Sequence, residues 1–220
     1  MILKLKGGES REFAAGLSGI EIARQISEGL ARAACAVSIN GEAQDLRTVP
    51  EEGADFGVLT FDDAEGAAAF RHTTSHILAQ AVKRLFPEAK LAIGPSIKDG
   101  FYYDFEFAEP LKPEDLEKIE KEMAKIVSEN LEITRFTLPR SEAIALMEQK
   151  GEPYKVQLIL DLPEDAELSF YQQGEYVDMC VGPHLCYTKA LKAFKLNKLS
   201  GAYWKNDRNN VMLTRIGGIA

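Results

Sequence analysis

The sequence predicts an α+β protein in which a small β-rich unit, residues 1–61, precedes a larger α+β unit, residues 62–220. Three observations predict it: strand-like runs around a two-residue turn before residue 61, two segments with apolar residues at helical spacing after residue 62, and an acidic stretch at the junction. Helices and strands that follow one another without strict βαβ alternation are typical of the α+β class.

The first unit has the order strand, strand, helix, hairpin, strand. A glycine turn between apolar runs in residues 2–13 predicts an opening pair of strands. Ser18 and Glu21 form the S-x-x-E capping box and predict the start of a helix. The Asn-Gly pair at 40–41 predicts a two-residue hairpin, and residues 56–61 supply the last strand. This order indicates a β-grasp module of the ubiquitin type.

The acidic residues 62–65 mark the boundary and the start of a long helix, because carboxylates stabilise a helix N-terminus. Apolar residues at helical spacing continue to Phe86, and Pro87 ends the pattern. Residues 100–107 then alternate between apolar and polar side chains. This alternation predicts a half-buried strand.

Four further elements follow in the second unit. Pro113 begins a helix with a regular apolar stripe, and residues 141–150 form a shorter helix closed by Gly151. The apolar runs at 154–160 and 176–180 predict two strands.

Composition excludes several classes of protein. With 45% hydrophobic and 27% charged residues, the chain is neither collagen-like, nor disordered, nor a disulfide scaffold. No apolar run approaches the ~18 residues of a membrane span, and the N-terminus lacks a signal-peptide pattern. We therefore expect a cytoplasmic protein without membrane contact. The odd number of cysteines, Cys35, Cys180 and Cys186, predicts free thiols.

Charge is distributed unevenly along the chain. The net charge is −8, yet residues 189–215 contain seven basic residues and only one acidic residue, which leaves −14 for the rest. This basic segment also contains Phe194, Tyr203 and Trp204, so it can meet phosphates and stack a base. A solvated lysine face over a core stripe is the alternative, and the pattern favours neither.

The three histidines of the chain all lie in two short motifs, His72-Thr-Thr-Ser-His76 and Cys180-Val-Gly-Pro-His184. Residues four apart share one face of a helix, so His72 and His76 project into one space. The Gly-Pro turn can fold His184 back beside Cys180. If the two segments meet, one pocket contains three imidazoles and a thiol.

Two chemistries suit this set. Three histidines and one cysteine are good tetrahedral zinc ligands, although Thr73 follows His72 where a zinc protease of the H-E-x-x-H type has its glutamate. Alternatively, a neutral imidazole can take a proton from water while an ammonium and a carboxylate stabilise the array. Lys155 and Asp178 are the candidates for these two groups. Unrelated core histidines are the third interpretation.

Six motifs together carry a family resemblance: His72–His76, Ile93–Pro95, Gly100–Asp104, Gly151–Lys155, Tyr176–His184 and Gly201–Trp204. They resemble the N-terminal half of bacterial threonyl-tRNA synthetases, and the resemblance spans the whole chain. It implies a TGS module of β-grasp fold over residues 1–61 and an editing domain over residues 62–220.

The resemblance implies an aminoacyl-tRNA deacylase that hydrolyses the ester of mischarged seryl-tRNA(Thr). One methyl group changes binding by only ~1–3 kcal/mol, so a synthetase for threonine needs a second site that removes serine. The partner is then the 3′ end of tRNA(Thr) carrying serine. ATP and a synthetic-site zinc belong to family domains that these 220 residues do not include. We expect a monomeric fragment with no evident protein partner.

Site roles follow from the resemblance by matching position. Four residues form the hydrolytic array: His72, Lys155, Asp178 and His184. Of these, His72 and Lys155 hold or activate the attacking water. Three residues line the amino-acid pocket: His76, Tyr103 and Cys180.

Two other functions stay open. A zinc-dependent deacylase of the alanyl type would hold its metal through His72, His76, Cys180 and His184. We expect no metal and no other cofactor in this fragment, because Lys155 and Asp178 match the threonyl pattern and give hydrolysis a metal-free route. The last possibility is a tRNA-binding module without catalysis.

Overall fold

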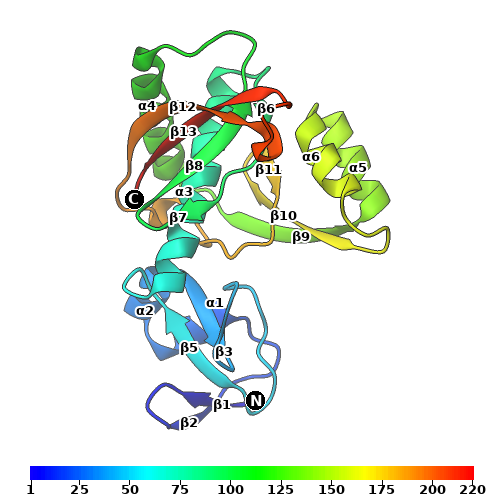
Figure 1. The fold of residues 1–220 in the computed structure, drawn as a ribbon. Helices are drawn as coiled ribbons and strands as arrows, with labels where there is room; N and C mark the ends of the chain where they lie inside the picture. The colour runs from blue at the N-terminus through cyan, green and yellow to red at the C-terminus, as the bar shows by residue number, and fades with distance from the viewer.

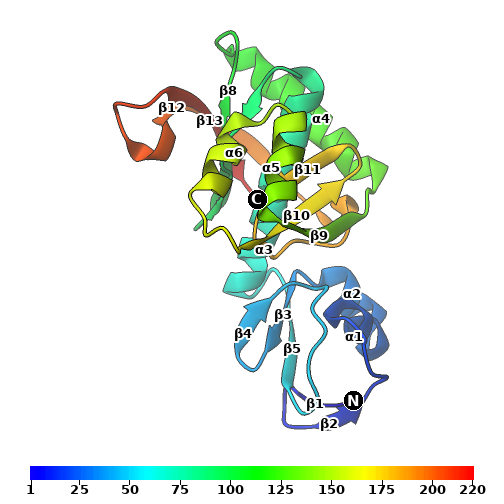
Figure 2. The same cartoon turned by 90° about the vertical axis from the view of Figure 1, so that its right-hand side faces the viewer.

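Three β-sheets organise the chain, which the computed structural model describes over residues 1–220 (Figure 1). The first sheet lies at one end of the molecule, and the other two lie together at the opposite end (Figures 1 and 2). Helices and strands are mixed along the chain, so the predicted α+β class is confirmed.

The first sheet has the strand order β2-β1-β5-β3-β4. Its strands are β1 (Ile2–Leu5), β2 (Ser10–Glu12), β3 (Ala36–Ile39), β4 (Glu42–Gln44) and β5 (Asp55–Leu59). β1 and β5 are parallel, whereas the other neighbours are antiparallel. Two helices follow β2, namely α1 (Gly19–Ile26) and α2 (Glu28–Ala33), and the sequence pattern predicts only the first. A separate core of nine buried residues lies between α1 and this sheet.

Two local signals of this unit are confirmed. The Ser18 side chain accepts from the Glu21 N–H, while the Glu21 side chain accepts from the Ser18 N–H, so the capping box starts α1. Asn40 and Gly41 join β3 to β4 with φ values of 50° and 83°. A two-residue turn of type I′ requires positive φ at both positions, and these two residue types tolerate it best.

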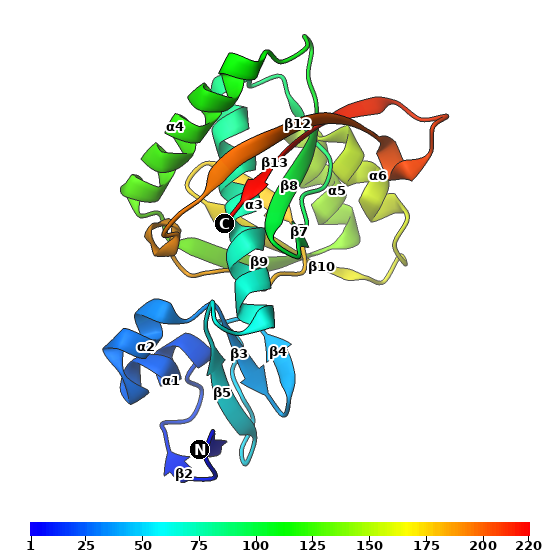
Figure 3. The same cartoon turned by 60° about the vertical axis from the view of Figure 1, so that its left-hand side comes forward.

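Helix α3 (Ala64–Leu85) begins beside the first unit and runs through the second (Figure 3). As predicted, it starts within the acidic segment at residues 62–65, and it ends before Pro87. Most of its middle is buried, because β8 (Gly100–Glu106) and α4 (Pro113–Glu129) share one core with it. Although α3 is the longest helix, neither it nor any other helix has the length and apolar character needed to cross a membrane.

The second sheet has the order β12-β13-β8-β6, and β7 also pairs with β8. Its other strands are β6 (Lys90–Leu91), β7 (Ser96–Ile97), β12 (Lys195–Tyr203) and β13 (Met212–Ile219). The third sheet is antiparallel and consists of β9 (Ile133–Pro139), β10 (Glu167–Gln173) and β11 (Tyr176–Met179). Helices α5 (Arg140–Gln149) and α6 (Pro153–Leu160) pack against the third sheet (Figure 2).

The predicted strand at residues 154–160 is wrong, because this segment is helix α6. Pro153 occupies the first turn, where its fixed φ suits a helix and its missing N–H needs no partner. The buried residues Tyr154, Lys155 and Ile159 then lie on one side of the helix. Gly151, with a φ of 69°, separates α6 from α5, as predicted for a helix C-terminus.

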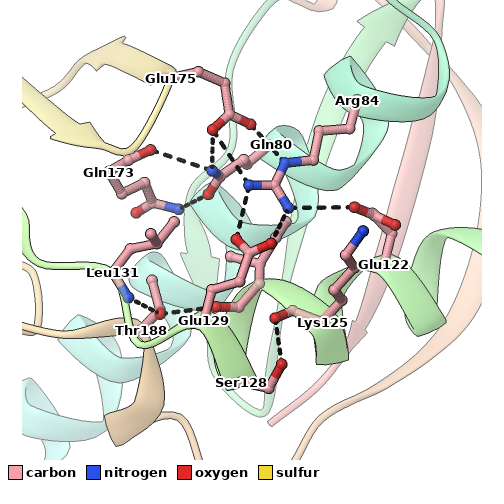
Figure 4. A network of polar contacts seen from close by, with 11 residues as sticks. Gln80, Arg84, Glu122, Lys125, Ser128, Glu129, Leu131, Gln173, Glu175 and Thr188 are labelled. Carbon is pink, nitrogen blue, oxygen red and sulfur yellow. Dashed lines mark hydrogen bonds and ion pairs between the residues drawn. The ribbon is translucent and has the colours of Figure 1, made fainter.

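Gln80 and Arg84 on α3 fasten the helix to the hairpin between β10 and β11 (Figure 4). Gln80 Nε2 donates to the Gln173 carbonyl at 3.2 Å, and Gln173 Nε2 donates to Gln80 Oε1 at 2.7 Å. Arg84 donates to the carboxylates of Glu175 at 2.6 Å and Glu129 at 2.8 Å. These contacts hold β11 and α4 in place against α3, the arrangement on which the site below depends.

Candidate active site

The two histidine motifs meet in the structure. Helix α3 supplies His72 and His76, and the turn after β11 supplies Cys180 and His184. The ring centroids of His184 lie 4.3 Å from His72 and 4.1 Å from His76, while His72 and His76 are 5.0 Å apart. One ligand atom from each of the four side chains lies within 4.8 Å of all the others. The predicted convergence of distant segments is therefore confirmed.

Hydrogen bonds orient the His184 ring from both sides. Thr73 Oγ1 accepts from the Leu185 N–H at 3.0 Å and lies 2.9 Å from His184 Nδ1. The Thr73 hydroxyl hydrogen can then point to Nδ1, which leaves the ring hydrogen on Nε2. That atom lies 3.0 Å from Cys180 Sγ. Cys180 is one of three free thiols, as predicted.

Asp178 is the polar centre of the cluster. Its Oδ2 accepts from the hydroxyls of Tyr103 and Tyr176, each at 2.6 Å, and lies 3.5 Å from His76 Nε2. Its Oδ1 forms an ion pair with Lys155 Nζ at 2.7 Å. Tyr176 is a site residue that sequence reasoning missed. Its position could have indicated this role, because it lies two residues before Asp178 and therefore on the same face of the strand.

Glu152 explains how α6 brings Lys155 to the cluster. Glu152 precedes the first residue of α6 and is 3% exposed. Its carboxylate accepts from the Leu91 N–H at 2.7 Å and pairs with Lys83 of α3 at 2.9 Å. The start of α6 is thus bound to both α3 and β6, and Lys155 lies in its first turn.

Burial sets the protonation of the histidines. It lowers the pKa of His72 to about 4 and that of His76 to about 3, although the Asp178 carboxylate opposes both shifts. Burial also lowers the pKa of His184 well below its ordinary value. All three imidazoles are therefore neutral at pH 7 and can accept a proton.

The Asp178 carboxylate is charged in the same interior. Burial by itself would raise its pKa, but Lys155 and then His76 outweigh that effect and lower it to about 2. Burial raises the pKa of the Cys180 thiol, so this sulfur stays protonated at pH 7. The cluster combines neutral bases with a buried ion pair, an arrangement suited to general base chemistry without a thiolate nucleophile.

The side chains of the cluster differ in their exposure to solvent. Asp178 and His184 are at most 1% exposed, whereas His72 and Cys180 are partly exposed and Val181 is 86% exposed. On the facing side, Gly94 lies against the Tyr103 ring, where a Cβ would come within 2.0 Å of a ring carbon. Among the three imidazoles, only that of His72 is partly exposed to solvent.

The four side chains also fit a zinc ion. They are the nitrogen and sulfur donors that tetrahedral zinc prefers, and their donor atoms are close together. His76 Nδ1 is buried and has no hydrogen-bond partner. An orphaned buried donor is a feature that a bound ligand can explain.

The basic segment at residues 189–215 is only partly available to a partner. Trp204 is 6% exposed and donates to Gln157 Oε1 at 2.9 Å, so this one of its three aromatic side chains is part of the core. Three of the seven basic residues are paired with carboxylates: Lys195 with Glu120, Lys205 with Asp161 and Arg215 with Asp104. Four cations and the exposed Tyr203 remain for contacts with a partner.

Part of the second unit matches a known domain family. Residues 168–217 match the family model described as the threonyl and alanyl tRNA synthetase second additional domain. This segment includes Asp178, Cys180 and His184, but neither His72 nor Lys155.

Nearly the whole chain is similar to part of several threonine–tRNA ligases. The chain is 56% identical over 216 residues to the ligase of Acetivibrio thermocellus, which is 98% of this chain and 34% of the relative. It is 56% identical over 214 residues to the ligase of Clostridioides difficile, 97% of this chain and 34% of the relative. Against the ligase of Carboxydothermus hydrogenoformans it is 54% identical over 218 residues, 99% of this chain and 34% of the relative. The chain thus spans about a third of the length of these relatives.

Proposed function

We propose that this chain is the editing part of a threonyl-tRNA synthetase and hydrolyses the ester of seryl-tRNA(Thr). The observation that carries the proposal is the buried cluster itself, in which neutral imidazoles adjoin a Lys155–Asp178 ion pair. Similarity to threonine–tRNA ligases and the match to a synthetase second additional domain support it.

In the proposed reaction a water molecule attacks the carbonyl carbon of the ester. His72, the most accessible imidazole, takes one proton from this water as the new C–O bond forms. Lys155 stabilises the negative charge that develops on the carbonyl oxygen, and Asp178 orients Lys155. The bond to the ribose oxygen then breaks, and the protonated His72 returns its proton to that oxygen. The products are free serine and a tRNA with an intact terminal hydroxyl.

Rigid walls give the proposed selectivity for serine. His76 and Tyr103 are fully or nearly fully buried, and Asp178 holds both. A pocket that cannot expand excludes the additional methyl of threonine, whereas a flexible pocket would discriminate poorly. We assign His76, Tyr103 and Cys180 to this pocket.

A second candidate is a zinc-dependent aminoacyl-tRNA deacylase of the alanyl type. The orphaned His76 Nδ1 and the close set of four donors favour it. His72, His76, Cys180 and His184 would hold the metal, which would supply an activated water and polarise the ester. In that case Lys155 and Asp178 would orient the surrounding polar groups.

A deacylation assay separates the candidates. The chain is incubated with seryl-tRNA(Thr), threonyl-tRNA(Thr) and seryl-tRNA(Ala), and free amino acid is measured with and without a chelator. Our proposal expects hydrolysis of the first substrate only, with no effect of the chelator, and loss of activity in His72→Ala. Activity that is lost with the chelator and restored by zinc would support the second candidate. No hydrolysis of any substrate would leave a tRNA-binding module.

The first unit also fits the proposed family. Its strand order β2-β1-β5-β3-β4, with β1 parallel to β5 and α1 packed on the sheet, supports a β-grasp module of the TGS type over residues 1–61. We propose that residues 62–220 form the editing domain.

A further inference from the structure

Two charged residues of the first unit, Asp45 and Arg47, reach the histidine cluster from outside the second unit. They follow β4, and their side chains are only 11% and 20% exposed. Arg47 Nη1 lies 2.9 Å from Asp45 Oδ1, so the two form a salt bridge. Neither residue has a part in the hydrolytic steps proposed above.

Arg47 binds the backbone carbonyls of two segments that are far apart in the sequence. Its guanidinium donates to the carbonyl of His184 at 3.2 Å and to that of Leu185 at 2.8 Å. It also donates to the carbonyl of Ile133 on β9. One planar side chain thus holds the His184 segment against the third sheet. Hydrogen bonds from a charged donor are roughly twice as strong as neutral ones.

Asp45 binds the backbone N–H of His184, the residue whose carbonyl Arg47 binds. Its Oδ2 accepts from the His184 N–H at 3.1 Å and from the Tyr171 hydroxyl at 2.7 Å. The Tyr171 ring in turn packs against the His184 imidazole, with centroids 4.4 Å apart. A Cβ at Gly182 would lie 2.1 Å from the Tyr171 hydroxyl, so the turn rests directly on this tyrosine.

The backbone of His184 is therefore fixed at its N–H and at its C=O by one ion pair of the first unit. Thr73 and Cys180 fix its ring, as described above. We propose that Asp45 and Arg47 are positioning residues for His184, so that the first unit is part of the hydrolytic site; this inference rests on the proposed function. If Asp45 and Arg47 only held the two units together, their substitution would change the stability of the chain but not the position of the His184 ring.

The test uses the whole chain and two readouts. The first is kcat and KM for deacylation of seryl-tRNA(Thr). The second is the imidazole region of a ¹⁵N–¹H NMR spectrum, to which the three histidines alone contribute. The variants are Asp45→Asn and Arg47→Lys, because Lys keeps the charge but lacks the planar fork that reaches several carbonyls. Arg11→Lys is the control, since exposed Arg11 donates to the Gln25 carbonyl within the first unit.

We expect both variants to lower kcat about 10- to 100-fold, because the His184 ring packs 4.3 Å from that of His72, the proposed base, and a small misplacement of a site group has effects of that size. KM should stay within about twofold, and the His184 signals should shift more than those of His72 and His76. The control should match the wild type. If both variants fail to fold, Tyr171→Phe replaces them, since it removes one hydroxyl from Asp45 and keeps the ring.

Two outcomes separate this inference from the proposed function. A wild-type chain that deacylates seryl-tRNA, with variants of unchanged kcat and unshifted His184 signals, would overturn the positioning role and leave the function intact. An inactive wild-type chain would overturn the function. In that case unshifted His184 signals in the variants would also overturn the positioning role, and shifted signals would support it.

Discussion

Asp178 interacts with four side chains and is itself almost completely buried. A buried ion pair contributes little net stability compared with a well-packed apolar pair, because both charges lose their hydration. Once one partner is removed, however, the other charge is left buried and uncompensated. Asp178 and Lys155 are 1% and 3% exposed, so this asymmetry applies to them. Their pairing is therefore a strong constraint on the position of both side chains.

For this reason Asp178→Asn should destabilise the chain and abolish the proposed activity. We expect the free energy of unfolding to fall by about 3–5 kcal/mol, because Lys155 would lose its buried counter-charge. Urea denaturation measures the loss, and the deacylation assay should show a fall of at least about 100-fold. Asp161→Asn is the control, since its pair with Lys205 is exposed and should change stability by less than about 1 kcal/mol. Equal effects of the two substitutions would contradict the burial argument.

The histidines make stability depend on pH in a defined direction. Their pKa values in the folded chain are lowered from 6.5, to about 4 for His72 and about 3 for His76. Below pH ~6.5 the unfolded chain therefore binds more protons than the folded chain. The resulting stability is fully present above pH ~6.5 and is lost as the pH falls toward 4. Urea denaturation of the chain with a chelator present should show this decline. In His72→Gln the decline should be smaller by up to about 3 kcal/mol; an identical decline would show that His72 is not buried in its neutral form.

At the residue scale, sequence reasoning found the four-residue cluster but not its supports. His72 and His76 were predictable because helical spacing places them on one face, and no other histidine besides His184 existed to compete. Asp45 and Arg47 were not predictable, since their contacts with His184 join residues far apart in the chain and follow no periodicity.

At the scale of elements, α6 shows why a short apolar run is ambiguous. Residues 154–160 are long enough for a strand and too short for a helical period to appear clearly. Pro153 was the informative signal, because proline is common in the first turn of a helix. The long helices α3 and α4 were predictable, since their apolar stripes repeat over several turns. β12 and β13 were missed because lysines and glycines interrupt their alternation.

A substitution of Glu152 tests whether its ion pair with Lys83 positions α6. Glu152→Gln keeps the volume of the side chain but breaks its ion pair with Lys83. We expect a loss of about 1–3 kcal/mol in the free energy of unfolding, because a buried polar contact is removed. The kcat of deacylation should fall about 10-fold as Lys155 shifts, while KM should not change. Glu164→Gln, at an exposed position, is the control and should match the wild type. A Glu152→Gln variant with wild-type kcat would show that α6 is held by its apolar face alone.

At the scale of the whole molecule, the two units jointly form a positive surface on an acidic protein. A cavity of about 380 Å³ lies where they meet, and its lining includes Arg24 and Arg32 from the first unit and Lys189 and Lys192 from the second. Both lysines are exposed and belong to the part of the basic segment that has no carboxylate partner. The net charge of −8 therefore hides a local excess of cations.

This charge distribution predicts which lysines contact RNA. Each phosphate contact releases counterions, so the affinity for uncharged tRNA(Thr) should fall as salt rises from about 50 to about 200 mM. Lys192→Ala should weaken binding and reduce the slope of log K against log salt by about 0.7, the value for one contact with a single strand. Lys205→Ala should leave the slope unchanged, because Asp161 already neutralises that ammonium. Filter binding across the salt range measures both slopes. Equal slopes for Lys192→Ala and the wild type would place the RNA elsewhere, since a lysine on the bound surface cannot be removed without loss of its counterion release.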